Sequence, residues 1–188
     1  MRVIAGKYRS RPLRSLRGMD VRPTSDRLRE TLFNVLTAGD PNALAESVWL
    51  DLFAGTGAVG IEALSRGARE VYFVESDPPA AAVIHANLKS LGIEQGAELI
   101  ERDALSGLRR LDSQALSFDY CFLDPPYRAE EAYGEALGFL SQSSGLSPAS
   151  IVIAEHDKRF DPGDRHGALQ RYRTLRQGDA VLSFYRLK

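Results

Sequence analysis

Short apolar runs alternate with amphipathic segments along most of the chain. Near-continuous apolar runs are typical of parallel strands that are buried on both faces. Five runs predict such strands, at residues 48–53, 70–75, 97–103, 118–123 and 150–155. Apolar residues at helical spacing predict helices between them, at residues 61–66, 78–91 and 129–140. This alternation predicts an α/β fold with a mostly parallel, Rossmann-like sheet.

The two ends of the chain have other patterns. Residues 169–175 and 180–187 predict an antiparallel pair around the turn Gln177-Gly178-Asp179, which brings the predicted sheet to seven strands with an antiparallel C-terminal strand. Residues 2–22 alternate basic with apolar or small residues and predict a small basic hairpin. We therefore expect an N-terminal arm over residues 1–22 and a main domain over residues 23–188. Residues 157–178 carry no recognisable motif.

A helix is predicted after the arm. Thr24, Ser25 or Asp26 can cap it, because each side chain can accept from a free amide at a helix N-terminus. Leu28, Leu32, Val35 and Leu36 fall on one face, which we expect to bury against the main domain.

Charge divides the chain unequally. The net charge is −1, but residues 1–30 carry nine basic and three acidic residues, a net charge of +6, and the remainder carries −7. A basic N-terminal segment with an interleaved tyrosine suits phosphate contacts and base stacking. The candidate RNA-binding residues are Lys7, Arg9, Arg11, Arg14, Arg17, Arg22, Thr24 and Arg27. A solvated basic arm without a partner is the alternative.

The sequence also indicates the compartment. No apolar run approaches the roughly 20 residues that span a bilayer, and the N-terminus lacks the apolar region of a secretory signal. The single cysteine, Cys121, lies in an apolar run. We expect a cytoplasmic protein that does not bind membranes. His85, His156 and His166 lack ligand-like neighbours, so no metal site is predicted.

A glycine loop follows the first predicted strand. The segment Ala54-Gly55-Thr56-Gly57-Ala58-Val59-Gly60 lies between that strand and a helix, which is the context that a nucleotide-binding fingerprint requires. Glycine permits a tight turn and lets a ligand approach the backbone. A purely structural turn is the alternative.

Acidic residues mark the ends of the predicted strands. Asp51, Glu75, Asp103 and Asp124 follow one another on consecutive strands, and the carboxyl ends of parallel strands line the ligand crevice of such sheets. Glu75 has the spacing of an acid that accepts from ribose hydroxyls, and Asp103 could recognise adenine or cap a helix. The candidate cofactor-binding residues are Asp51, Phe53, Gly55, Thr56, Gly57, Gly60, Glu75, Ser76, Asp103 and Ala104.

The segment Asp124-Pro125-Pro126-Tyr127 follows the fourth strand. Two prolines fix φ and remove backbone donors, so this corner offers rigid acceptors for an amino group and a flat face for a ring. A nicotinamide dinucleotide and S-adenosylmethionine both suit the glycine loop. The corner favours S-adenosylmethionine, because hydride transfer has no evident use for it, whereas methylation of a ring amine does.

Three segments resemble known motifs. Asp51-x-Phe53-Ala54-Gly55-x-Gly57 resembles the first motif of class I S-adenosylmethionine-dependent methyltransferases, and Asp124-Pro125-Pro126-Tyr127 resembles their amino-methylating motif. Arg22-Pro23-Thr24-x-Asp26-Arg27-x-Arg29-Glu30-Thr31-Leu32-Phe33-Asn34, with Gly6-Lys7 upstream, is similar to the RsmD family. The last position of the corner is often Phe in that family and is Tyr here; either ring can stack on a base.

The resemblance implies a class I methyltransferase fold and methyl transfer to N2 of one guanine in 16S ribosomal RNA. Asp124 and the Pro125 carbonyl would accept from the amine, and Tyr127 would stack on a base turned out of its helix. The implied partner is 16S ribosomal RNA or an assembling small subunit, and we expect a monomer. Two other hypotheses stay open: an adenine-N6 DNA methyltransferase, which shares the corner, and a nucleotide- or RNA-binding module without catalysis.

Overall fold

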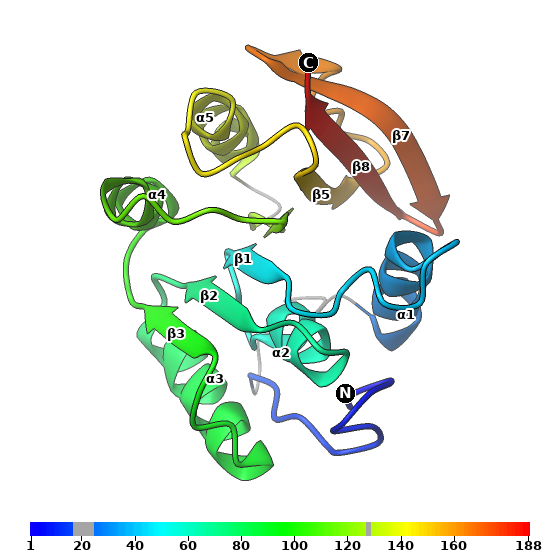
Figure 1. The fold of residues 1–188 in the computed structure, drawn as a ribbon, viewed down its shortest axis with the longest axis vertical. Helices are drawn as coiled ribbons and strands as arrows, with labels where there is room; N and C mark the ends of the chain where they lie inside the picture. Colours follow the sequence, from blue (N-terminus) through cyan, green and yellow to red (C-terminus); the bar gives the residue numbers. More distant parts are fainter. Residues whose placement is uncertain (17–24, 127–128) are drawn as a thin grey trace.

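The structure is a computed structural model that describes residues 1–16, 25–126 and 129–188. Among these residues, one sheet of eight strands runs through the molecule in the order β3-β2-β1-β4-β5-β8-β7-β6 (Figure 1). The strands are β1 Val48–Leu52, β2 Glu70–Val74, β3 Ala97–Ile100, β4 Tyr120–Leu123, β5 Ile151–Asp157, β6 Arg165–His166, β7 Leu169–Gln177 and β8 Ala180–Leu187.

The predicted α/β architecture is confirmed. Strands β1 to β5 pair in parallel, and β8, β7 and β6 extend the sheet in antiparallel pairings. The predicted number of seven strands was wrong, because Arg165 and His166 pair with β7 as an eighth strand. The third strand ends at Ile100 and not at the predicted Asp103. A two-residue strand is too short to show a period of two, so its pattern is not visible in the sequence.

Five helices are described, and each connects or flanks strands of the sheet. They are α1 Asp26–Leu36, α2 Ala58–Ser65, α3 Pro78–Leu91, α4 Ala104–Ser113 and α5 Glu130–Leu140. Ser25 caps α1 by accepting from Leu28 N at 3.1 Å. Asp77 caps α3 by accepting from Ala80 N at 3.1 Å, and Gly92 ends it at φ +69°. None of the helices described here is long and apolar enough to span a membrane.

The helices lie in two layers. Figure 1 shows α4 and α5 on one side of the sheet, and α1, α2 and α3 on the other. Strand β1 is buried on both faces, since Trp49 and Leu50 are both fully buried and belong to the cores on opposite sides. Trp49 stacks between Phe33 of α1, at 5.3 Å between ring centroids, and Tyr120 of β4, at 4.6 Å. Leu28 and Leu32 of the predicted face are buried in the same core, and Val35 and Leu36 are partly buried against it, so the predicted apolar face of α1 packs on the sheet.

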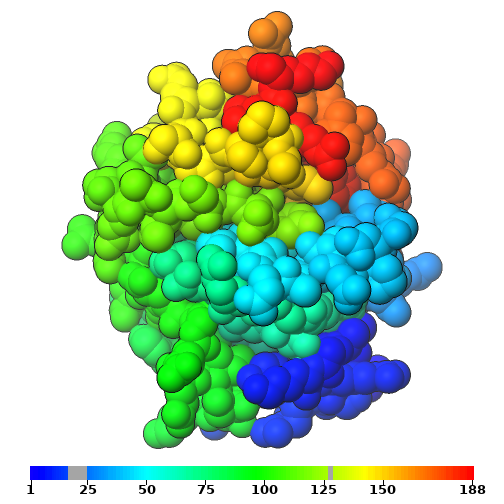
Figure 2. All heavy atoms as spheres, in the orientation of Figure 1, coloured from blue at the N-terminus to red at the C-terminus, as the bar shows by residue number. Residues whose placement is uncertain are grey.

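Residues 1–16 fold back on themselves and dock on α2. Arg2 and Pro12 form an antiparallel bridge, which is the predicted hairpin in a minimal form. The buried carboxylate of Glu62 accepts from Ile4 N at 2.8 Å and from Ala5 N at 3.0 Å. In Figure 2 this segment forms a dark blue ridge along one end of the molecule. The predicted boundary between residues 22 and 23 lies outside the described residues.

Gly6 brings the segment closest to α2. Its φ is +80°, and a Cβ at this position would lie 1.8 Å from the carbonyl oxygen of Ser65. The Ser65 hydroxyl accepts from Tyr8 N at 2.9 Å and donates to Ala5 O at 2.5 Å. Glycine is required here both by the backbone conformation and by the close approach.

Candidate active site

The carboxyl ends of β1, β2 and β4 lie side by side. Leu52 of β1 pairs with Val74 of β2 and with Leu123 of β4, so the residue that follows each strand emerges at the same level of the sheet. These are Phe53, which directly precedes the glycine loop, Glu75 and Asp124. The predicted convergence of these features at one edge of the sheet is therefore present.

The glycine loop has an unusual backbone. Phe53, Gly55 and Gly57 have φ values of +65°, +55° and +74°. A non-glycine residue in this region costs about 1–3 kcal/mol, so Phe53 stores strain directly beside the loop. A Cβ at Gly55 would meet nothing within 4 Å, whereas one at Gly57 would lie 3.3 Å from Ile84 and Phe73. Gly55 is thus the loop glycine whose backbone faces open space and can be approached by a ligand.

Glu75 joins the loop to the start of α3. One carboxylate oxygen accepts from Gly55 N at 2.7 Å, and the other accepts from Asp77 N at 2.8 Å. Each carboxylate oxygen can accept more than one hydrogen bond, so the side chain is fixed in place and retains capacity for ligand hydroxyls. Ser76 follows it and is exposed. This arrangement suits the predicted contact with a ribose.

A hydrogen bond joins the buried Asp51 to Gly60, the last residue of the glycine loop. The buried Asp51 carboxyl accepts from Gly60 N at 2.9 Å. Burial raises the pKa of Asp51 to about 7; the Gly60 hydrogen bond lowers it, and the charge of Glu75 raises it further. A Cβ at Gly60 would lie 2.3 Å from the Phe73 ring, so this glycine allows α2 to pack against β2. The structure gives both residues a role in holding the loop, and direct contact of either with a cofactor stays a prediction.

Asp103 caps α4. Its carboxylate accepts from Ser106 N at 2.9 Å, and hydrogen bonds from Ser106 hold the pKa of this exposed carboxyl below its usual range. The capping alternative is therefore confirmed. Asp103 lies three residues beyond the end of β3, next to the partly buried Ala104. Recognition of adenine by these two residues stays a prediction.

The proline corner begins directly at the end of β4. Asp124 N donates to Leu52 O at 3.4 Å, which ties the corner to the end of β1. Asp124 is partly buried, Pro125 is buried and Pro126 is exposed, and the Pro126 carbonyl accepts from Ala129 N at 2.8 Å. A carboxylate at this point can accept from an amino group presented to the edge of the sheet. Tyr127, which we predict to stack on the base, lies outside the described residues.

Asn87 is a site residue that the sequence reasoning missed. It is fully buried in α3, where its amide donates to Thr56 O at 3.0 Å and to Arg14 O at 3.2 Å. Its carbonyl oxygen accepts from Arg14 N at 2.7 Å. One side chain thus fastens the glycine loop to the basic segment. A signal existed in the sequence, since Asn87 lies three residues from Ile84, within the apolar face of the helix.

Those predicted RNA-binding residues that the structure describes lie on the docked segment and on α1. Lys7, Arg9, Arg11 and Arg14 are exposed, as is Arg27 of α1. The Arg11 guanidinium donates to Ser90 O at 2.8 Å. Their contact with RNA stays a prediction. Arg17, Arg22 and Thr24 lie outside the described residues.

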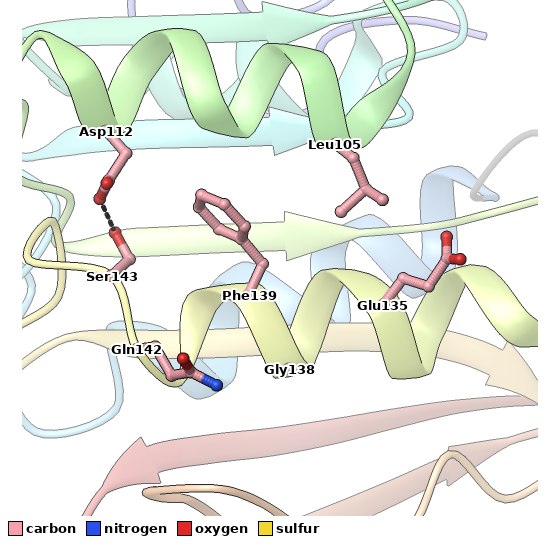
Figure 3. Close-up of a pocket in the computed structure, with 7 residues that line it drawn as sticks. All are labelled: Leu105, Asp112, Glu135, Gly138, Phe139, Gln142 and Ser143. Carbon is pink, nitrogen blue, oxygen red and sulfur yellow. Dashed lines mark hydrogen bonds between the residues drawn. The ribbon is translucent and has the colours of Figure 1, made fainter.

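A separate groove of about 390 Å³ lies between α4 and α5 (Figure 3). Leu105 and Phe139 point into it beside the carboxylates of Asp112 and Glu135, and Asp112 accepts from the Ser143 hydroxyl at 2.7 Å. None of the described residues that line the groove is basic, so these residues offer no positive charge to a phosphate. In the described parts of the chain, no group of three or more His, Cys, Asp or Glu side chains could hold a metal ion.

The chain is similar to known methyltransferases over most of its length. A family model described as conserved hypothetical protein 95 matches residues 1–186. A proposed rRNA methyltransferase of Bacillus subtilis, YlbH, is 33% identical over 99% of this chain and 98% of its own. Ribosomal RNA small subunit methyltransferase D of Haemophilus influenzae is 38% identical over 84% of this chain and 79% of its own. The solved structure of a proposed methyltransferase of Escherichia coli, yhhF, has a TM-score of 0.82 at 29% identity and covers 100% of this chain and 98% of its own.

Proposed function

The chain belongs to the conserved hypothetical protein 95 family, and we propose that it transfers a methyl group from S-adenosylmethionine to the N2 amine of a guanine in 16S ribosomal RNA. The observation that carries this proposal is the placement of Asp124 at the same sheet edge as the glycine loop and Glu75. A cofactor bound along that edge would have its reactive group beside an acceptor for an amine.

The hydrogen bonds of the loop favour S-adenosylmethionine over a nicotinamide dinucleotide. A pyrophosphate bound at a helix N-terminus needs free backbone amides. Here Gly55 N donates to Glu75, Gly57 N donates to Ala54 O at 2.7 Å, and Gly60 N donates to Asp51. These amides already have partners, and two of the partners are carboxyl groups. A cofactor with a positively charged sulfonium fits such a loop better than an anionic one.

The residues of the corner would prepare the amine for attack. An exocyclic amine is a poor nucleophile because its lone pair is delocalised into the ring. Hydrogen bonds from its N–H groups to the Asp124 carboxylate and to the Pro125 carbonyl would orient it and favour a pyramidal nitrogen. S-adenosylmethionine supplies an activated methyl group when it is bound, so proximity and alignment account for most of the catalysis. Tyr127 would hold the flipped base by stacking.

The proposal of a ribosomal substrate is supported by the basic segment and by the similarity to named relatives. Two relatives named Ribosomal RNA small subunit methyltransferase D, from Haemophilus influenzae and Escherichia coli, are 38% and 32% identical to this chain. The docked segment presents Lys7, Arg9, Arg11 and Arg14 on the surface of the domain. A chain of 20.7 kDa offers little area for reading RNA sequence, so an assembled or assembling small subunit is the proposed substrate.

Labelled methyl transfer to small-subunit particles, free 16S RNA and duplex DNA tests this function. We expect label in the ribosomal substrates, and N2-methylguanosine after digestion of the RNA to nucleosides. Label in DNA alone, as N6-methyladenosine, would refute the proposal in favour of an adenine methyltransferase. Cofactor binding without transfer to any substrate would favour a binding module without catalysis.

A further inference from the structure

The C-terminal part of the chain, which contains the region without a sequence motif, has a positive net charge. Residues 157–188 carry eight basic and four acidic side chains, a net charge of +4, whereas residues 31–156 carry seven basic and 18 acidic ones, a net charge of −11. The basic N-terminal segment is therefore one of two positive regions. The second lies on β6, β7 and β8, at one edge of the sheet (Figure 1).

The four acidic side chains of this region all have basic partners. The ion pairs are Asp157 with Arg159 at 2.8 Å, Asp161 with Arg171 at 2.6 Å, Asp164 with Arg171 at 2.5 Å, and Asp179 with Lys158 at 2.6 Å. Arg173 and Arg186 are exposed and form no ion pair with any residue that the structure describes. The excess charge of the region is thus presented to solvent by these arginines among others.

A β-bulge gathers Tyr172, Arg173 and Arg186 on one face. The pairing of β7 with β8 shifts between Arg171 and Arg173, so two consecutive residues contact the same side chain, Phe184. Tyr172 lies 6.3 Å from the Phe184 ring centroid, and the Arg173 guanidinium lies 5.9 Å from it. In a regular strand, consecutive side chains point to opposite faces, and a bulge is a means of re-aiming one of them.

Tyr172 is the exposed aromatic ring of this surface. It is 46% exposed, and no other large hydrophobic side chain is exposed in the parts of the chain that the structure covers. The Arg186 guanidinium stacks on it at 4.7 Å from the ring centroid. An exposed aromatic ring flanked by arginines that form no ion pair with a described residue is an arrangement on which unpaired bases stack while their phosphates are bound.

We propose that Tyr172, Arg173 and Arg186 form a second RNA-binding surface, the hairpin patch, which binds single-stranded RNA remote from the methylated nucleotide. This inference rests on the proposed RNA substrate. Phe184 belongs to the core on the α1 side, which also contains Val3 and Leu13 of the basic segment. The hairpin patch and the basic segment therefore lie on the same side of the sheet, where one RNA can contact both.

The patch is separated from the proline corner along the strands. Tyr185 pairs with Val152, near the start of β5, so Arg186 lies near the amino ends of the parallel strands. Asp124 lies at their carboxyl ends. Leu123 pairs with Ala154, so Asp124 is level with Glu155, whereas Arg186 is level with Ile151. At about 3.3 Å per residue, these four residues separate the two sites by about 13 Å along the strands. The patch consequently contributes to RNA affinity and not to the methyl-transfer step.

Substitution of the patch with matched controls tests this. Arg173→Ala removes an arginine that forms no ion pair with a described residue, and the control Arg110→Ala removes one that pairs with Glu98 at 2.7 Å, on α4 across the sheet. Affinity for 16S RNA is measured at several salt concentrations, together with kcat and KM for methyl transfer. Arg173→Ala is expected to lower the slope of log affinity against log salt by about 0.7 and to raise KM with kcat unchanged, whereas Arg110→Ala leaves the slope unchanged. Tyr172→Ala is expected to weaken binding about fivefold or more, and Tyr172→Phe to retain it.

The outcomes separate this proposal from the proposed function. If the wild type methylates RNA but the patch variants bind it as the wild type does, or if Arg173→Ala and Arg110→Ala weaken binding equally, the patch is a solvated face and the inference is overturned. Absence of RNA binding by the wild type overturns the patch and the proposed function together. All three substituted side chains are exposed, so circular dichroism of each variant is expected to match the wild type.

Discussion

The buried carboxyl of Asp51 makes the stability of the protein depend on pH. Its pKa is about 7 in the folded protein, against 3.8 for an ordinary aspartate. The folded state therefore binds this proton more tightly than the unfolded state does. The contribution of the protonated Asp51 to the free energy of unfolding is fully present below about pH 4. It is lost as the pH rises from about 4 to about 7, because ionisation of the buried group is disfavoured.

The size of this effect follows from the shift. One pKa unit corresponds to 1.36 kcal/mol, so a shift of roughly three units costs about 4 kcal/mol above pH 7. The substitution Asp51→Asn removes the charge and retains a carbonyl oxygen that can accept from Gly60 N. We therefore expect the free energy of unfolding of Asp51→Asn to exceed that of the wild type by up to about 4 kcal/mol at pH 8, and by less than half as much at pH 5.

Urea unfolding of both proteins at pH 5 and pH 8 measures this difference. Asp112→Asn provides the control, because it makes the same charge change in the groove between α4 and α5. The control is expected to differ from the wild type by a similar amount at the two pH values. A constant difference between Asp51→Asn and the wild type across this range would show that Asp51 is ionised in the folded protein, and would refute the reasoning.

Two further substitutions test how the basic segment is attached. Gly6→Ala places a Cβ 1.8 Å from Ser65 O at a φ of +80°, so we expect the free energy of unfolding to fall by at least about 2 kcal/mol and limited proteolysis to cut the segment sooner; an unchanged melting temperature would contradict the docked position. Asn87→Ala leaves Thr56 O and the backbone of Arg14 without their partner, which should cost about 2–3 kcal/mol and weaken cofactor binding measured by calorimetry. Wild-type affinity for the cofactor in Asn87→Ala would show that the amide does not support the loop.

Much of the fold and part of the site were predictable from sequence. Most strands of the parallel sheet are near-continuous apolar runs, and Glu75 and Asp124 directly follow two of them. Pattern and topology together therefore predict that these two acids meet the glycine loop. These signals are local in sequence and strong. The role of Asp103 was predicted less well, because a carboxylate that follows a strand can bind a ligand or cap a helix equally well.

The features that sequence did not predict depend on contacts between distant residues. The hydrogen bonds of Glu62 with Ile4 and Ala5, and of Asn87 with Arg14, join residues 57 to 73 positions apart. No periodicity encodes such pairs, and a basic segment has the same pattern whether it is free or docked. The bulge that brings Tyr172 and Arg173 to the same face of the sheet could not be predicted from sequence either, because it breaks the alternation by which strands are detected.

The central claim is that the Asp124 carboxylate orients the amine that receives the methyl group. Methyl transfer by Asp124→Ala under single-turnover conditions, with cofactor affinity measured in parallel by calorimetry, tests it most directly. The expected result is loss of transfer with cofactor affinity largely retained, because Glu75 and the glycine loop stay in place. Transfer at the wild-type rate by Asp124→Ala would contradict the claim.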